Sequence, residues 1–106
     1  MITIARKFLR LALCTLLTIA TPASHATDKL TVLLDWFVNP DHGPLIVAAQ
    51  RGMFQTAGLE VSLIAPADPN DPPKLVAAGK ADIAVSYQPQ LHLQVAEGLP
   101  LTRIGT

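Results

Sequence analysis

Three segments of this chain begin near a proline and end at a glycine, and each lies between short apolar runs. They extend from Pro44 to Gly52, from Pro72 or Pro73 to Gly79, and from Pro89 to Gly98. Proline suits the first turn of a helix, where its missing N–H is no loss, and glycine readily takes the left-handed conformation that ends one. The pattern predicts three helices, with Asp71 as the N-cap of the second.

The apolar runs between these helices have the composition of strands. They span Leu30 to Trp36, Leu59 to Ile64, Ile83 to Ser86 and Thr102 to Gly105. Strands that alternate with helices indicate parallel βαβ units, so we expect an α/β fold. The prolines and aspartates between Ala65 and Asp71 predict a surface loop.

The first 26 residues have the pattern of an export signal. An apolar stretch of ten residues, 11–20, follows a basic start, and Ser24-His25-Ala26 supplies the small residues of a cleavage site. The basic residues are Arg6, Lys7 and Arg10. We predict cleavage after Ala26, which divides the chain into a signal peptide, residues 1–26, and a folded portion, residues 27–106.

Two other interpretations of this start are a transmembrane helix and a lipoprotein signal. The apolar stretch is shorter than the roughly 20 residues of a spanning helix, and Pro22 follows it. Leu13 is bulky where the residue before a lipidated cysteine is normally small. Cys14 is therefore assigned to the signal peptide, and residues 27–106 have no cysteine for disulfide, metal or nucleophile chemistry.

The charge of residues 27–106 disfavours nucleic acid as a partner. Five basic side chains stand against eight acidic ones, a net charge of −3. Nucleic-acid binding depends on clustered lysine and arginine, and no such cluster is present in this part of the sequence.

The apparent fourth strand has no helix after it to cover it. Parallel sheets normally carry helices on both faces, and about 80 residues bury only a marginal core. We expect the N-terminal piece of a longer protein, with a complete miniature domain as the alternative.

A hydrophobic run leads directly into Asp35 and Trp36, and Asn39 and His42 follow shortly after. Ligands of open α/β sheets bind at the carboxyl ends of the strands. A carboxylate accepts hydrogen bonds from an amine, an indole stacks on a flat ring, and amide or imidazole groups serve ring nitrogens. These four residues are therefore candidate ligand-binding residues. The alternatives are that Trp36 is a core aromatic, that Asp35 caps the next helix, and that His42 is a loop histidine with a backbone partner.

Ser86 and Tyr87 form a second candidate segment, at the end of the third predicted strand. They add a hydroxyl and an aromatic ring beside the N-terminus of the third predicted helix, where backbone N–H groups favour polar ligands. The alternative is that Ser86 or Gln88 only caps this helix. His92, within the helix, is expected to face solvent and is assigned no chemistry.

The span from Lys29 to Thr106 resembles the SsuA/THI5-like (NMT1/THI5) family. This family contains periplasmic binding proteins of ABC importers and the thiamine pyrimidine synthases. The resemblance is carried by Val32–Trp36, Asn39, His42, Ala48–Phe54, Ala57–Val61 and Leu75–Ala84. It implies a truncated N-terminal lobe of a periplasmic-binding-protein-like fold, two-lobed and of type II in the full protein.

The Asp-Trp pair with its following Asn and His resembles the members that handle thiamine precursors. The resemblance implies a monomeric periplasmic protein that binds a hydroxymethyl- or formylaminomethyl-aminopyrimidine by hinge closure and delivers it to an ABC permease in the inner membrane. It implies no catalytic residue, metal or cofactor. Other members bind sulfonates or nitrate-like anions, which Asp35 would repel. A sensor's binding module is a further alternative.

The enzymatic alternative is a thiamine pyrimidine synthase, a homodimer that uses iron and makes the pyrimidine from histidine and pyridoxal phosphate. Its lysine and histidine are expected where this sequence has Ser86 and Gln90. Pyridoxal phosphate forms a Schiff base only with an amine, so Ser86 cannot replace the lysine. The sequence therefore favours the binding protein over the enzyme.

Overall fold

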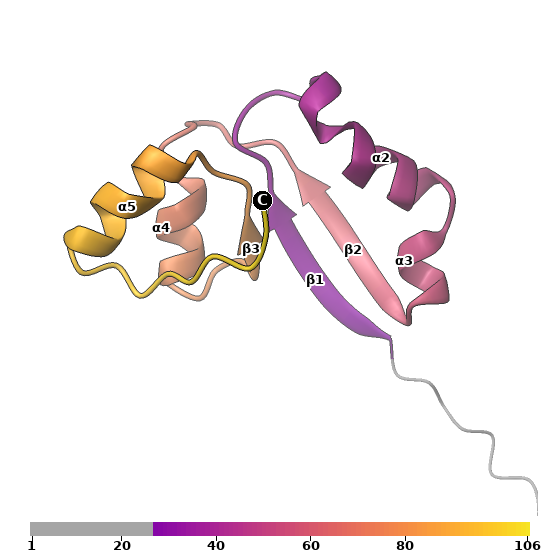
Figure 1. Ribbon diagram of the computed structural model, residues 1–106. Coiled ribbons are helices and arrows are strands. Elements are labelled where there is room, and N and C mark those ends of the chain that lie inside the picture. The colour runs from indigo at the N-terminus through magenta and orange to yellow at the C-terminus, as the bar shows by residue number, and fades with distance from the viewer. Residues whose placement is uncertain (1–26) are drawn as a thin grey trace, which may run out of the picture.

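One parallel sheet organises the fold, as the computed structural model of residues 27–106 shows; the predicted signal peptide lies outside the described residues. Its strands are Asp28–Leu33 (β1), Leu59–Ile64 (β2) and Ile83–Ala84 (β3), in the order β2-β1-β3 (Figure 1). Both pairings with β1 are parallel. The predicted α/β class with parallel βαβ units is confirmed.

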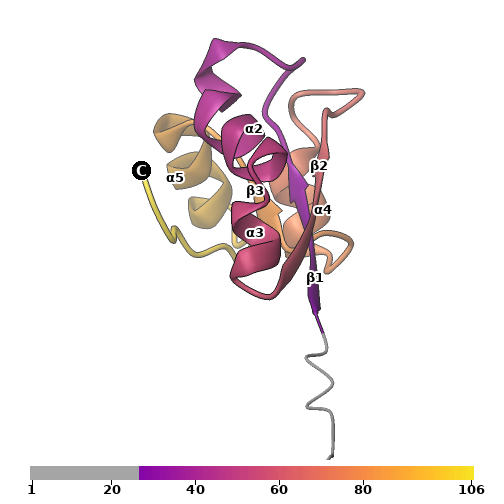
Figure 2. The ribbon, with the colours of Figure 1, turned by 90° about the vertical axis from the view of Figure 1, so that its right-hand side faces the viewer.

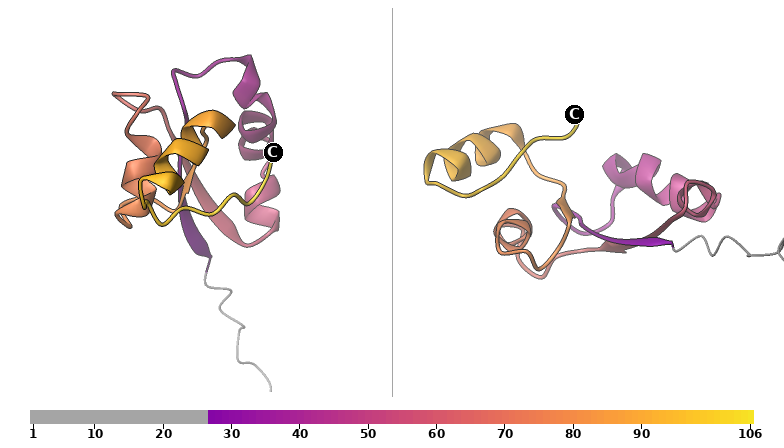
Figure 3. Two further views of the ribbon diagram at one scale, coloured as in Figure 1. Left: turned by 60° about the vertical axis from the view of Figure 1, so that its left-hand side comes forward. Right: turned by 90° about the horizontal axis from the view of Figure 1, so that it is seen from below.

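Helices lie on both faces of this sheet. In chain order they are the 3₁₀ helix Pro40–His42 (η1) and the α-helices Gly43–Gln50 (α2), Met53–Thr56 (α3), Pro72–Ala77 (α4) and Gln88–Ala96 (α5). The views from the side and from below place α2 and α3 on one face and α4 on the other (Figures 2 and 3). The first crossover runs from β1 to β2, and the second runs back from β2 past β1 to β3. Crossovers of the same hand that run in opposite directions along a sheet place their helices on opposite faces. None of the helices in residues 27–106 is long and apolar enough to cross a membrane.

The core is centred on the carboxyl end of β1. Val32, Leu33 and Leu34 are buried, and Leu34 has no exposed surface. A central parallel strand is covered on both faces, so its residues are apolar without alternation. This buried run fixes the backbone from which the first candidate site residues project.

The strand boundaries differ from the prediction at β1 and β3, whereas β2 matches it. β1 begins at Asp28, which pairs with Leu59, and the chain bends at Asp35 rather than continuing to Trp36. Ser86 lies beyond β3, which ends at Ala84, and the last hydrogen bond to β1 is donated by the Val85 N–H to the Leu33 carbonyl at 2.8 Å.

The predicted fourth strand, residues 102–105, is wrong: this segment has no regular structure. It runs back from α5 towards β3 without joining the sheet (Figure 1). β3 has only two paired residues, so it offers few hydrogen bonds with which residues 102–105 could pair as a further strand.

The helix predictions are confirmed in position but not in detail. The first helix ends at Gln50, and Gly52, with φ +67°, lets the chain turn into α3, a helix that the sequence analysis missed. Asp71 occupies the N-cap position of α4, but its side chain makes no capping bond. Its backbone is already helical, with φ −84° and ψ −36°, whereas a capping side chain normally projects from an extended residue.

Candidate functional site

Asp35 lies directly after Leu34, the fully buried residue that follows β1. Leu34 donates its N–H to the Ile64 carbonyl at 2.8 Å, which holds the chain to β2 up to the bend. The Asp35 side chain is 13% exposed, so its carboxylate is largely enclosed yet reachable from solvent. The sequence therefore places a carboxylate at the carboxyl end of the central strand, where this class of sheet binds ligands.

His42 holds this carboxylate. Its Nε2 lies 2.6 Å from Asp35 Oδ1, and its ring is 2% exposed. Its Nδ1 accepts the backbone N–H of Asn39 at 3.3 Å, so Nδ1 carries no proton and Nε2–H is the donor to Asp35. The His42 ring has a backbone partner, as the alternative interpretation supposed, and a carboxylate partner as well.

Asn39 shapes the loop between β1 and α2. Its Oδ1 accepts the N–H of Asp41 at 2.9 Å, and its Nδ2 donates to the Phe37 carbonyl at 3.0 Å. Asn39 thereby caps η1, the helix that carries His42. The structure thus brings Asp35, Asn39 and His42 together, but the polar groups of Asn39 and His42 are engaged within the protein.

Tyr87 links the end of β3 to this cluster. Burial raises the pKa of Asp35, but donation from the Tyr87 hydroxyl and from the His42 ring outweighs it, so the pKa lies below its ordinary value. The carboxylate in turn raises the pKa of Tyr87. The His42 contact is the close one, at 2.6 Å, whereas the Tyr87 side chain is 62% exposed and is held less firmly. Residues that follow β1 and β3 therefore meet at Asp35.

Trp36 is not a core residue. It is 48% exposed and packs edge-on against Phe37, with ring centroids 5.6 Å apart and planes at 83°. Phe37 and Val38 are more exposed still. The loop after Asp35 therefore presents an apolar, aromatic surface next to a negative charge. Asp35 is likewise no helix cap, because its side chain bonds to the His42 ring rather than to helix N–H groups.

Ser86 and Gln90 hydrogen-bond to each other. The Ser86 hydroxyl donates to Gln90 Oε1 at 2.9 Å, one helical turn further on. Neither Ser86 nor Gln88 caps α5. Tyr87 occupies the N-cap position, and no side-chain capping hydrogen bond is made there. Gln88 instead lies 3.4 Å from the exposed ring of His92, which faces solvent as expected.

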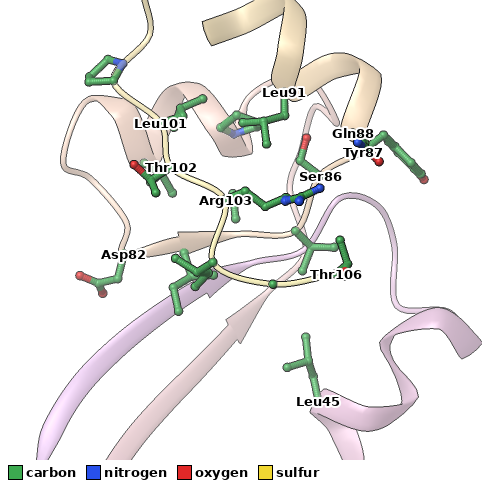
Figure 4. Close-up of a pocket in the computed structure, with 18 of the residues that line it drawn as sticks. Leu45, Asp82, Ser86, Tyr87, Gln88, Leu91, Leu101, Thr102, Arg103 and Thr106 are labelled. Carbon is green, nitrogen blue, oxygen red and sulfur yellow. The ribbon is translucent and has the colours of Figure 1, made fainter.

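A cavity of about 860 Å³ lies beside this cluster, between β3, the start of α5 and the C-terminal segment. Ser86 and Tyr87 line it, and Figure 4 shows the Arg103 side chain extending across it towards Ser86. The sequence analysis missed the contributions of Leu45, Leu91 and Arg103. No local signal identifies these residues, because their place in the lining depends on how the C-terminal segment folds back.

The described residues offer little to a metal ion. Within residues 27–106, histidine, aspartate and glutamate side chains nowhere gather in the groups of three or more that a metal site needs. What the site presents chemically is an anionic acceptor, an adjoining aromatic surface and the hydroxyls of Ser86 and Tyr87.

Residues 39–106 match the family model described as NMT1/THI5 like. A protein of Haemophilus influenzae whose name assigns it to thiamine biosynthesis is 60% identical over 86 residues, which cover 81% of this chain and 27% of that protein. A 4-amino-5-hydroxymethyl-2-methylpyrimidine phosphate synthase of Uromyces fabae is 38% identical, over 76% of this chain and 24% of the synthase. The formylaminopyrimidine-binding protein of Halalkalibacterium halodurans is 37% identical, over 76% of this chain and 24% of that protein.

The chain spans about a quarter of the length of these curated relatives. The family has a periplasmic-binding-protein-like fold, and the three-stranded parallel sheet with helices on both faces agrees with one portion of it. The matched region contains Asn39, His42, Ser86 and Tyr87 together with strands β2 and β3, whereas β1, Asp35 and Trp36 precede it. On the family match, the relatives and the architecture together, this chain belongs to the NMT1/THI5-like family.

Proposed function

We propose that this chain is part of a solute-binding protein of an ABC importer, and that its ligand is a thiamine-precursor pyrimidine. The observation that carries the proposal is the Asp35 carboxylate, which His42 holds and whose pKa is lowered, beside the exposed ring of Trp36. An aminopyrimidine has a flat face for an indole and an exocyclic amine for a carboxylate. A hydroxymethyl- or formylaminomethyl-aminopyrimidine is the ligand that we infer.

The relatives support this ligand class from a second direction. One of them is named as a formylaminopyrimidine-binding protein, and others are named as synthases of a related pyrimidine phosphate. Both kinds of name refer to an aminopyrimidine, as ligand or as product, and a third relative is named for thiamine biosynthesis. Asp35 also disfavours anionic ligands, since a carboxylate repels them.

The proposed mechanism is hinge closure. Ligand docks at the ends of β1 and β3, and a second lobe closes over it. The closed form is then recognised by a permease in the inner membrane. Binding shifts the open and closed populations only by its differential affinity for them, so contacts with the second lobe must add to those of Asp35 and Trp36. In this proposal the protein is a periplasmic monomer, exported by a cleaved signal peptide, and needs no cofactor.

The second candidate is a pyrimidine synthase, favoured by the names of several relatives. The Ser86 and Gln90 positions argue against it, since the resemblance implies a lysine and a histidine there. The two side chains are neutral and are bonded to each other at 2.9 Å, and neither is an amine that attacks pyridoxal phosphate. Iron and pyridoxal phosphate belong to this candidate alone.

The test is calorimetric titration of the full-length protein with both pyrimidines. We expect micromolar or tighter binding, which Asp35→Asn weakens at least tenfold, about 1.4 kcal/mol. Asp28→Asn is the matched control, because Asp28 is exposed at the opposite, amino end of the same strand and should leave affinity unchanged.

The same protein is incubated with pyridoxal phosphate and borohydride. Absence of pyrimidine binding, together with a trapped pyridoxyl adduct, would reject the importer and favour the synthase. Equal losses in the Asp35 and Asp28 variants would reject the proposed location of the site.

A further inference from the structure

His42 cannot act on a ligand directly in this structure. Its ring is 2% exposed, and both nitrogens have protein partners, Asn39 N–H on one side and Asp35 Oδ1 on the other. The sequence pattern placed His42 among the residues that contact ligand. Its burial gives it a different role.

We infer that His42 is a positioning residue that fixes the Asp35 carboxylate for ligand, an inference that rests on the proposed function. The backbone N–H of Asn39 holds Nδ1, which sets the tautomer and orients the ring. The Nε2–H then donates to Oδ1 at 2.6 Å, which leaves Oδ2 outside this hydrogen bond. The ligand's amine is therefore assigned to Oδ2.

The strength of this arrangement comes from its charge and its enclosure. A hydrogen bond to an ionised carboxylate is shorter and stronger than one between neutral groups. Partners behind a ligating side chain fix its orientation and tune its basicity, as is well documented for residues behind metal ligands. Here the loop backbone holds the His42 ring, the ring holds the Asp35 carboxylate, and the carboxylate holds the ligand.

The two titratable side chains that face Asp35 are held differently. The titratable groups that face the carboxylate are His42, from η1, and Tyr87, which precedes α5. Tyr87 is 62% exposed, so a ligand can move its side chain aside without opening the core. His42 is buried and remains in place. His42 therefore sets the carboxylate's position, whereas the exposed Tyr87 can give way to ligand.

Two variants separate this role from a purely structural one. Asn has a polar atom where histidine has Nδ1, so His42→Asn can keep the bond to the Asn39 N–H but cannot reach Asp35. Gln has its amide nitrogen where histidine has Nε2, so His42→Gln can restore the donor to Asp35. The readouts, in the full-length protein, are the pKa of Asp35 from carbon NMR and the affinity for formylaminomethyl-aminopyrimidine from calorimetry.

We expect His42→Asn to raise the pKa of Asp35 and to weaken binding about tenfold, the lower end of the effect seen for such supporting contacts. His42→Gln should bring both values back towards those of the parent. An unchanged Asp35 pKa in a folded His42→Asn variant would overturn the inference, as would equal effects of the two variants. If the parent binds no pyrimidine while the Asp35 pKa still responds in this order, the proposed function fails and the positioning role stands.

The unmutated protein gives a check that does not depend on the folding of any variant. Nitrogen–proton correlation NMR of the imidazole reports which nitrogen carries the proton. A proton on Nε2, with Nδ1 unprotonated, supports the assignment. A proton on Nδ1 overturns it.

Discussion

Leu34→Ala tests whether the core at the end of β1 holds the candidate site. Leu34 has no exposed surface, and it immediately precedes Asp35. The substitution removes three carbons, worth about 0.8 kcal/mol each in transfer from water, and leaves a cavity that the surrounding backbone fills only in part. We expect a loss of about 3–4 kcal/mol in the free energy of unfolding, in the middle of the range for buried leucines.

The matched control is Leu93→Ala, because Leu93 lies on α5 with 67% of its surface exposed. The same chemical change there should cost less than about 0.5 kcal/mol. Urea denaturation of the full-length parent and both variants, followed by circular dichroism, gives the two differences. If the two substitutions shift the transition equally, Leu34 is not the buried centre described here, and the account of how Asp35 is held fails with it.

Two further predictions concern acid stability and the turn after α2. Asp35 has a folded pKa below its ordinary value of 3.8, so its stabilising contribution is present above that pH and is lost as the pH falls through the folded pKa. Asp35→Asn should abolish this part of the acid dependence, measured as the difference between urea transitions of parent and variant from pH 6 to pH 2. Gly52→Ala should cost about 1 kcal/mol, because φ is +67° there. Gly43→Ala, where φ is −47° and an added Cβ meets nothing within 4 Å, should be neutral or slightly stabilising by thermal melting.

Part of the candidate site was predictable from the order of residues. Asp35 and Trp36 follow an apolar run, and Ser86 and Tyr87 follow another, so parallel strands alone place both pairs at one edge of the sheet. The sequence did not show the exposure or the hydrogen-bond partner of each side chain. Trp36 is exposed rather than buried, and Ser86 bonds to a side chain rather than capping a helix.

The sequence by itself determined the α/β class and the positions at which the helices end. Proline and glycine act through their own backbone preferences, within a turn of where they stand, so these signals need no distant partner. Gly52, Gly79 and Gly98 all adopt positive φ, as their places after the predicted helices require.

Only the tertiary structure decided the order β2-β1-β3, the irregular course of residues 102–105 and the role of His42. Each depends on groups that lie apart in the sequence. Strand pairing depends on which edge of the sheet is free, and the chemistry of His42 depends on its burial against Asp35. A carboxylate and an imidazole seven residues apart can each face solvent or each other, and packing of the loop onto the core selects between these states.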